Sequence, residues 1–217
     1  MTTESNGTNG NRMKLVSVLV RGISPMLMNP ATEEVLAQLP GAGAGYKKGK
    51  DMKDRTREEI AEARVIRNKI ANKEGKHEVG IPAEYLYACI VEAGRLVAYD
   101  GKKKISTMDT TLIFSFLSIK ESFFSFENHD GKYEIDVRRG VNKTTKGAQA
   151  IVRPRFNDWK FRVTLEVDES DSNLTASKAR EIFDKAGKMI GLADFRPTCR
   201  GPFGRFEIAE WNELPMQ

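Results

Sequence analysis

A mixed α+β fold built on an antiparallel sheet is predicted by three observations. Short β-branched and aromatic runs alternate with amphipathic helical segments along the chain. Residues 159–168 alternate strictly between apolar and polar side chains, which is typical of a strand with one buried face. Two further runs flank the turn sequence NKTTKG, which predicts a β-hairpin. The 217 residues, 40% of them hydrophobic, contain no polar linker between two apolar halves, so one domain over 13–217 is expected.

The first strand is predicted where a β-branched run from Leu15 to Arg21 follows a disordered-looking tail at 1–12 and ends at Gly22. The next residues, ISPMLMNP, contain two prolines, so the chain is expected to leave the sheet and cover the core with its Met-Leu-Met segment. A short helix is expected at 31–39. The Gly- and Lys-rich stretch 41–54 predicts a mobile basic loop able to close over a ligand, or else a tolerated surface insertion.

Two helices are predicted next. Thr56 and Glu59 form a capping box, so a helix should begin there and run towards Ile70. Pro82 marks the start of the first main helix. Its apolar residues recur at three- and four-residue spacing: Leu86, Ile90, Ala93 and Val97.

The second half of the chain predicts mainly strands. Residues 111–119 and 123–126 are aromatic and β-branched, and 133–156 forms the basic hairpin. The strand at 159–168 follows. Ser172 or Asn173 then caps a helix that Gly191 ends, and 203–211 forms the last strand. Without the hairpin and loops, the order is strand, helix, strand, strand, helix, strand, which predicts a ferredoxin-like (RRM-like) split βαβ sheet.

Positive charge is concentrated in one region of the sequence. The formal net charge is +5 and the pI is about 9.1, so the overall excess is small. The local excess between 138 and 162 suits a polyanion, although a solvated charged face is the alternative. The cations are Arg138, Arg139, Lys143, Lys146, Arg153, Arg155, Lys160 and Arg162.

A glycine-rich segment, 191–208, is the second candidate binding element. Its glycines permit a close backbone approach to a ligand, and its arginines supply charge. The alternative is a connecting loop whose glycines satisfy positive φ angles. The candidate residues are Arg196, Arg200, Gly201, Gly204 and Arg205.

Catalytic and metal-binding motifs are not visible in the sequence. Cys89 and Cys199 are too few for a disulfide framework or a zinc site, which indicates a reducing cytosol. His77 and His129 stand in polar, Gly-flanked stretches outside known catalytic motifs. No apolar run is long enough for a signal peptide or a membrane span. We therefore expect a cytoplasmic protein without catalytic residues, metal or cofactor.

Nucleic-acid binding needs cations for phosphates, glycine backbone N–H groups and aromatic faces for bases. All three occur in the sequence. The alternate phenylalanines of the strands are candidates for base stacking, although core packing is the usual role of such residues: Phe114, Phe116, Phe124 and Phe126.

The glycine-rich segment before the last strand, the opening strand followed by SPMLMN, and the order of elements resemble the RAMP superfamily of CRISPR-associated RNA-binding proteins. The backbone subunits that line a guide RNA, or solitary phage and plasmid relatives, are the most similar members. The resemblance implies that 133–156 acts as a thumb against nucleic acid and that the loop with Gly201 and Gly204 contacts RNA. The aspartate that target-cleaving members place in a loop is not identifiable here.

The expected function is non-enzymatic binding of single-stranded RNA, or single-stranded DNA, through the hairpin, the sheet face and the glycine-rich loop. We expect a homo-oligomer or ribonucleoprotein subunit, forming a filament in a CRISPR-related or phage defence or counter-defence system. Two alternatives remain open. One is a metal-independent endoribonuclease of the CRISPR RNA-processing type that uses His77 or His129 as its base. The other is a protein-interaction or decoy module in phage–host conflict.

Overall fold

The computed structural model describes residues 12–31, 54–141 and 146–215. Its central element is a four-stranded antiparallel sheet with the order β11-β1-β10-β6. The strands are β1 (Met13–Gly22), β6 (Leu117–Ile119), β10 (Lys160–Asp168) and β11 (Phe206–Leu214). This confirms the prediction of a mixed α+β fold with antiparallel pairing.

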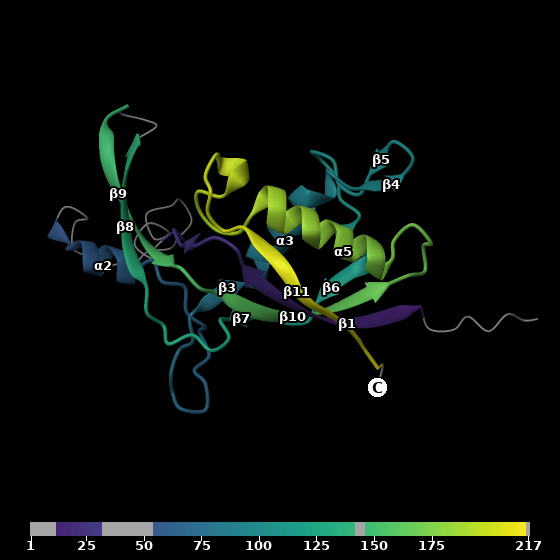
Figure 1. Ribbon diagram of the computed structural model, residues 1–217, viewed down its shortest axis with the longest axis horizontal. Coiled ribbons are helices and arrows are strands. Elements are labelled where there is room, and N and C mark those ends of the chain that lie inside the picture. Colours follow the sequence, from purple (N-terminus) through teal and green to yellow (C-terminus); the bar gives the residue numbers. More distant parts are fainter. Residues whose placement is uncertain (1–11, 32–53, 142–145, 216–217) are drawn as a thin grey trace, which may run out of the picture.

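Two helices cover one face of this sheet (Figure 1). They are α3 (Ala83–Gly94) and α5 (Ala176–Lys185), and the second continues into a π-helical turn at Ala186–Ile190 that ends at Gly191. The predicted alternation of β10 is confirmed, because Phe161, Val163, Leu165 and Val167 are buried beneath these helices. The core therefore lies between the sheet and the helix pair, and the opposite sheet face carries the polar residues.

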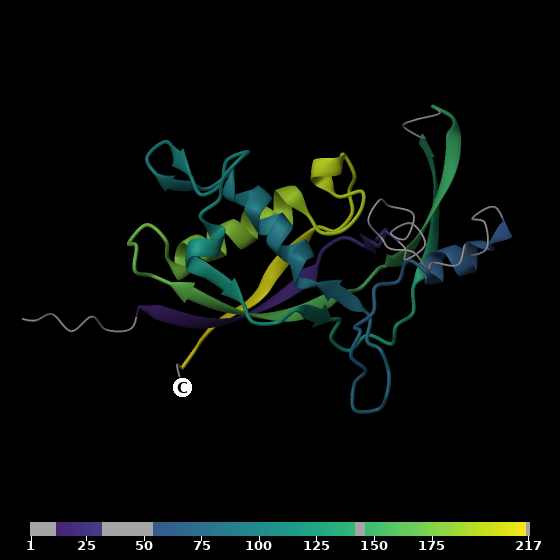
Figure 2. The same cartoon turned by 180° about the vertical axis from the view of Figure 1, so that it is seen from behind.

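A hairpin projects from one end of the molecule, and Figure 2 shows the same projection from behind. It consists of β8 (Glu134–Val141) and β9 (Ala148–Phe156), as the turn chemistry predicted, and we call it the hairpin arm. The short strand β2 (Met26–Leu27) pairs with its base. The Met-Leu-Met segment at 26–28 is fully buried, as predicted, and it also joins the arm to the end of β1.

The remaining elements are short. Strands β3 (Gly80–Pro82) and β7 (Phe123–Ser125) pair beside the arm, and β4 (Ala98–Asp100) and β5 (Lys103–Lys104) form a ribbon at the far end of the molecule (Figure 1). A 3-10 turn at Pro197–Cys199 lies in the loop before β11.

Of the two helices predicted before β6, the first is shorter than predicted and the second begins where it was predicted. Helix α2 (Arg57–Glu62) has both capping-box hydrogen bonds of Thr56, but it ends well before Ile70, because the chain turns to pair with residues 78–80. Helix α3 has Pro82 at its N-cap and buries the predicted Leu86, Ile90 and Ala93, whereas Val97 is buried just after the helix ends. The predicted helix at 31–39 and the basic loop at 41–54 lie almost wholly outside the described residues.

Three predictions in the second half need correction. Residues 113–116 form a helical turn, α4 (Ile113–Phe116), where a strand was predicted, because burial of Ile113 and Phe116 follows a three-residue spacing. The cap of α5 is Thr175, whose hydroxyl accepts from the backbone N–H of Lys178. The last strand begins at Phe206, three residues later than predicted, because the preceding loop folds back on itself.

Candidate nucleic-acid interface

The hairpin arm carries an excess of positive charge. Residues 134–156 contain six Lys or Arg and two acids, Asp136 and Glu134, which pair with Arg138 and Arg155. Arg139 and Lys146 are exposed, and neither has an ion pair with another described residue. Lys143 lies outside the described part of the chain. Cations of this kind, held on a projecting element, are free to neutralise phosphates.

The base of the arm is attached to the loop after α5 by a buried ion pair. Arg153 is 7% exposed, and its Nε donates to Asp194 Oδ2 at 2.6 Å. The Asp194 carboxylate also accepts from the Asn29 side chain at 3.0 Å and from the Phe195 backbone N–H at 2.9 Å. The predicted role of Arg153 as a free phosphate contact is therefore replaced by a structural one in this geometry.

A second guanidinium lies close to this pair. Arg64 follows α2, and its Nη1 donates to the carbonyl oxygen of Val152 on β9. Burial lowers the pKa of Arg64, and the nearby positive charge of Arg153 lowers it further, while Asp194 raises it. Arg64 therefore lies close enough to the Arg153–Asp194 pair to interact with both charges. Arg64 was not among the predicted site residues, because a charged residue just after a short helix gives no sequence signal of a long-range contact.

Arg138 links the middle of the arm to the same loop. Its guanidinium carbon lies 4.7 Å from the centroid of the Phe203 ring and 5.7 Å from that of Phe195. Its Nε also donates to the Asp136 carboxylate at 2.8 Å. The structure therefore places the hairpin arm against the loop that contains Phe195 and Phe203.

The glycines of the loop serve its own packing. A Cβ on Gly201 would lie 1.8 Å from the Phe195 carbonyl oxygen, and one on Gly204 would lie 1.9 Å from that of Leu192. Gly204 also has a φ of +68°. These contacts explain both glycines without a ligand, so the structure favours the alternative interpretation, a loop whose glycines meet conformational needs.

The arginines of the loop divide into two groups. Arg196 is engaged by the Ala193 carbonyl oxygen at 3.0 Å and by Glu92 at 3.7 Å. Arg200 and Arg205 are exposed and have no ion pair within the described ranges. Of the three loop arginines, Arg200 and Arg205 are therefore free to contact an anion.

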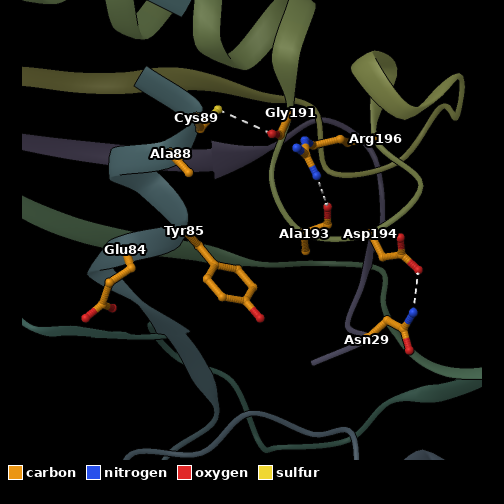
Figure 3. A pocket seen from close by; sticks show the side chains of 9 residues that line it. All are labelled: Asn29, Glu84, Tyr85, Ala88, Cys89, Gly191, Ala193, Asp194 and Arg196. Carbon is orange, nitrogen blue, oxygen red and sulfur yellow. Dashed lines mark hydrogen bonds between the residues drawn. The ribbon is translucent and has the colours of Figure 1, made fainter. Parts of the chain in front are cut away.

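A cleft of about 290 Å³ lies between α3 and this loop (Figure 3). Glu84, Tyr85, Ala88 and Cys89 of α3 line one side, and Asn29, Gly191, Ala193, Asp194 and Arg196 line the other. Burial raises the pKa of Tyr85, and the Asp194 charge adds to this effect. Asp194 and Tyr85 are further contacts that sequence reasoning missed, since neither stands in a motif.

The thiol in this cleft is chemically inert in the folded chain. Burial raises the pKa of Cys89 to about 12, and the thiol donates to the Gly191 carbonyl oxygen at 3.3 Å. Because the thiolate is the nucleophilic form, Cys89 holds α3 against the loop and supplies no nucleophile. The cleft offers shape and polar contacts to a ligand.

Most charges that the described chain places on the sheet face opposite the helices are paired, with Lys160 as an exception. Arg21 pairs with Glu207 at 2.6 Å, Arg162 pairs with Glu210 at 3.0 Å and with Glu127 at 3.3 Å, and Lys120 pairs with Glu166. Three of the four candidate stacking phenylalanines are buried in the core, as the alternative interpretation held: Phe116, Phe124 and Phe126. Phe114 is 64% exposed but lies against Tyr87 of α3. This face therefore offers little of the free charge or the stacking surface expected of a nucleic-acid platform.

The predicted cations are distributed over three places in the structure. Arg138, Arg139, Lys146 and Arg153 belong to the arm, beside the loop with Arg196, Arg200 and Arg205. Arg155 and Lys160 line a separate pocket at the start of β10. Arg162 lies on the sheet face opposite the helices.

The two histidines line one groove of about 870 Å³ between residues 67–79 and 126–131. His77 Nδ1 lies 2.7 Å from the carbonyl oxygen of Asn68, to which it donates. His129 Nδ1 accepts from the backbone N–H of Gly131 at 2.9 Å. In their neutral forms, His77 therefore presents a lone pair at Nε2 and His129 presents an Nε2–H.

Metal-ligating clusters of three or more His, Cys, Asp or Glu are absent from the ranges that the structure describes. Within those same ranges, no helix is long and apolar enough to cross a bilayer.

Comparison with known proteins finds similar chains among solved structures. No protein family and no curated protein matches the sequence. A chain of the cryo-EM structure described as "Type III-B Cmr-beta bound to cognate target RNA" aligns with a TM-score of 0.48 and 10% identity. The alignment covers 94% of this chain and 61% of the neighbour, so the chain spans about three fifths of the neighbour's length.

Proposed function

We propose that the chain binds single-stranded RNA, with single-stranded DNA as the alternative ligand, and that it does so without cleaving it. The observation that carries this proposal is the projecting hairpin arm, which has six cations against two acids between 134 and 156. Its exposed Arg139 and Lys146, with Arg200 and Arg205 of the neighbouring loop, supply charge that other described residues leave uncompensated.

A ferredoxin-like sheet of the RAMP type is part of this proposal. The strand order β11-β1-β10-β6, with α3 and α5 on one face, supports it. We propose that several copies bind along one strand in a CRISPR-related or phage defence or counter-defence ribonucleoprotein. Val137 and Val141, which are 39% and 60% exposed on the arm, support contact with a second copy.

The test is fluorescence anisotropy of a labelled 20-nucleotide RNA with the double variant Arg139→Glu/Lys146→Glu. Both side chains are exposed, so the fold should survive the change. The matched control is Lys102→Glu/Lys103→Glu, which makes the same charge change at the far end of the molecule. We expect the arm variant to lose at least about 10-fold in affinity and the control less than about 3-fold. Equal losses, or none, would remove the arm from the interface.

Arg153→Glu with Arg155→Glu is a poor test, because it would place a new carboxylate beside Asp194 at the base of the arm. Loss of binding in that variant would report unfolding as readily as a missing contact.

A second candidate function is metal-independent RNA cleavage, and the histidine groove favours it. His77 presents the lone pair that a general base needs, and His129 presents the proton that a general acid needs. Incubation of the protein with RNA in excess chelator tests this function. Cleavage that is lost in both His77→Ala and His129→Ala would establish it, and intact RNA after long exposure would leave binding alone.

A further inference from the structure

A pocket of about 660 Å³ lies where β10 begins, beside the base of the arm. Residues 127–133 form one wall, the base of the arm forms another, and the end of β1 closes the third side. Trp159 contributes to the lining but is only 3% exposed, with its indole N–H donating to the Ser24 carbonyl oxygen at 2.9 Å. We call this cavity the β10 pocket.

Most charges that line the β10 pocket are compensated locally. Arg21 pairs with Glu207, Lys132 pairs with Asp130 at 2.7 Å, and Glu127 pairs with Arg162. Among the described residues, Arg155, Lys160 and Asp158 remain as the lining charges without a close ion pair. The pocket therefore has a surplus of one positive charge before His129 is counted.

The Arg155 guanidinium makes few polar contacts with the described residues. Its one carboxylate neighbour in the described chain is Glu134, 3.9 Å away, which exceeds hydrogen-bond distance. The Nε atom of Arg155 is buried and has no hydrogen-bond partner in the part of the chain that the structure describes. The side chain is 35% exposed, so part of the guanidinium remains open to the pocket.

Lys160 stands directly opposite Arg21 in the register of β1 and β10. Like charges in this position destabilise a strand pair. Arg21 is compensated by Glu207, whereas the Lys160 ammonium is not compensated by any described residue. An anion in the pocket would relieve this repulsion.

His129 adds a neutral donor. Its Nδ1 accepts from Gly131, so the proton of the neutral ring is on Nε2. The ring is held edge-on to Phe126, with centroids 5.7 Å apart, and it packs against Phe156 at 5.5 Å. Its orientation is therefore fixed by the core.

We propose that the β10 pocket binds a phosphate group, held by the Arg155 guanidinium, the Lys160 ammonium and the His129 Nε2–H. Because it names the chemical group that this site takes from a nucleic-acid chain, the proposal rests on the function proposed above. Guanidinium and ammonium groups are common phosphate ligands, and an imidazole N–H supplies a directional hydrogen bond.

The direct test is a titration of the protein with inorganic phosphate at constant ionic strength, observed by NMR of ¹³C-labelled histidine. The chain has two histidines, and His77 lines the neighbouring groove but not this pocket, so it is an internal control. We expect the His129 ring signal to shift saturably while His77 stays in place. Lys160→Gln should weaken the apparent affinity at least about 5-fold. No His129 shift, equal shifts of both rings, or an unchanged affinity in Lys160→Gln would overturn the proposal.

Two further variants separate this proposal from the proposed function. Lys160→Gln should lower the magnitude of the log–log salt slope of RNA binding by about 1, as expected for one phosphate contact. Asp158→Asn removes the uncompensated acid of the pocket and should tighten phosphate binding. RNA binding that persists with an unchanged slope in Lys160→Gln would refute the β10 pocket and leave the arm as the interface. Phosphate binding without RNA binding would refute the proposed function and leave the pocket.

Discussion

Substitution of Asp194 by Asn should destabilise the fold far more than loss of a surface ion pair. The carboxylate is 2.6 Å from Arg153, which is 7% exposed, and Arg64 places a second guanidinium nearby. Removing the charge leaves the buried Arg153 without this ion pair and removes the favourable interaction of Asp194 with Arg64. Breaking a buried pair costs about 3–5 kcal/mol. Since the Asp194 side chain is 29% exposed, water can solvate the site and reduce this cost. We therefore expect the free energy of unfolding to fall by about 3 kcal/mol.

Urea unfolding followed by circular dichroism measures this loss, and a thermal scan should show a midpoint lowered by about 6–12 °C. The matched control is Glu207→Gln, because Arg21 and Glu207 are also 2.6 Å apart but are 59% and 43% exposed. That change should cost about 0–1 kcal/mol. The reasoning fails if the two variants lose the same stability. A double variant, Arg153→Met/Asp194→Leu, should be less destabilised than Asp194→Asn, because it removes both buried charges.

Three other predictions follow from single residues. Native protein should expose one reactive thiol per chain to a thiol reagent at pH 8, because Cys199 is exposed while burial raises the pKa of Cys89 to about 12; two reactive thiols before unfolding would contradict this. Gly204→Ala should lower the free energy of unfolding by more than about 1 kcal/mol, since its φ is +68° and a Cβ would clash with a backbone carbonyl of its own loop; an unchanged urea midpoint would disprove the packing role. Burial, followed by a hydrogen bond to Glu62, raises the pKa of Tyr133 from 10.0 to about 12. The protonated Tyr133 hydroxyl therefore contributes fully to the free energy of unfolding below pH 10, and this contribution is lost as the pH rises towards 12. Urea unfolding at a series of pH values between 10 and 12 should therefore show that Tyr133→Phe loses less free energy of unfolding than the unsubstituted chain. Identical pH dependence in the two proteins would count against this.

Local chemistry in the sequence predicted the elements that depend on short-range patterns. The alternation of β10, the capping box at Thr56 and the stop at Gly191 each have a local cause, and each is present in the structure. Residues 113–116 were misassigned because a short apolar run suits either a strand or a buried helical turn.

The candidate site was harder to predict because its contacts join distant parts of the chain. The sequence identified the basic arm and the loop after Gly191, but it gave no sign that Asp194 would bind Arg153, 41 residues away. It also gave no sign that Arg64 would lie beside them, or that Gly201 and Gly204 would pack against their own loop. Carboxylate partners decide which arginines are free, and spacing along a sequence does not reveal them.

The central claim is that the arm binds a nucleic-acid strand by neutralising its phosphates. The most direct measurement is the affinity of the unsubstituted chain for a 20-nucleotide single strand between 50 and 200 mM salt. The free cations are Arg139 and Lys146 of the arm and Arg200 and Arg205 of the loop, and three of them acting together predict a log–log slope of about −2. An affinity that does not change over this range, or no binding at the lowest salt, would contradict the account.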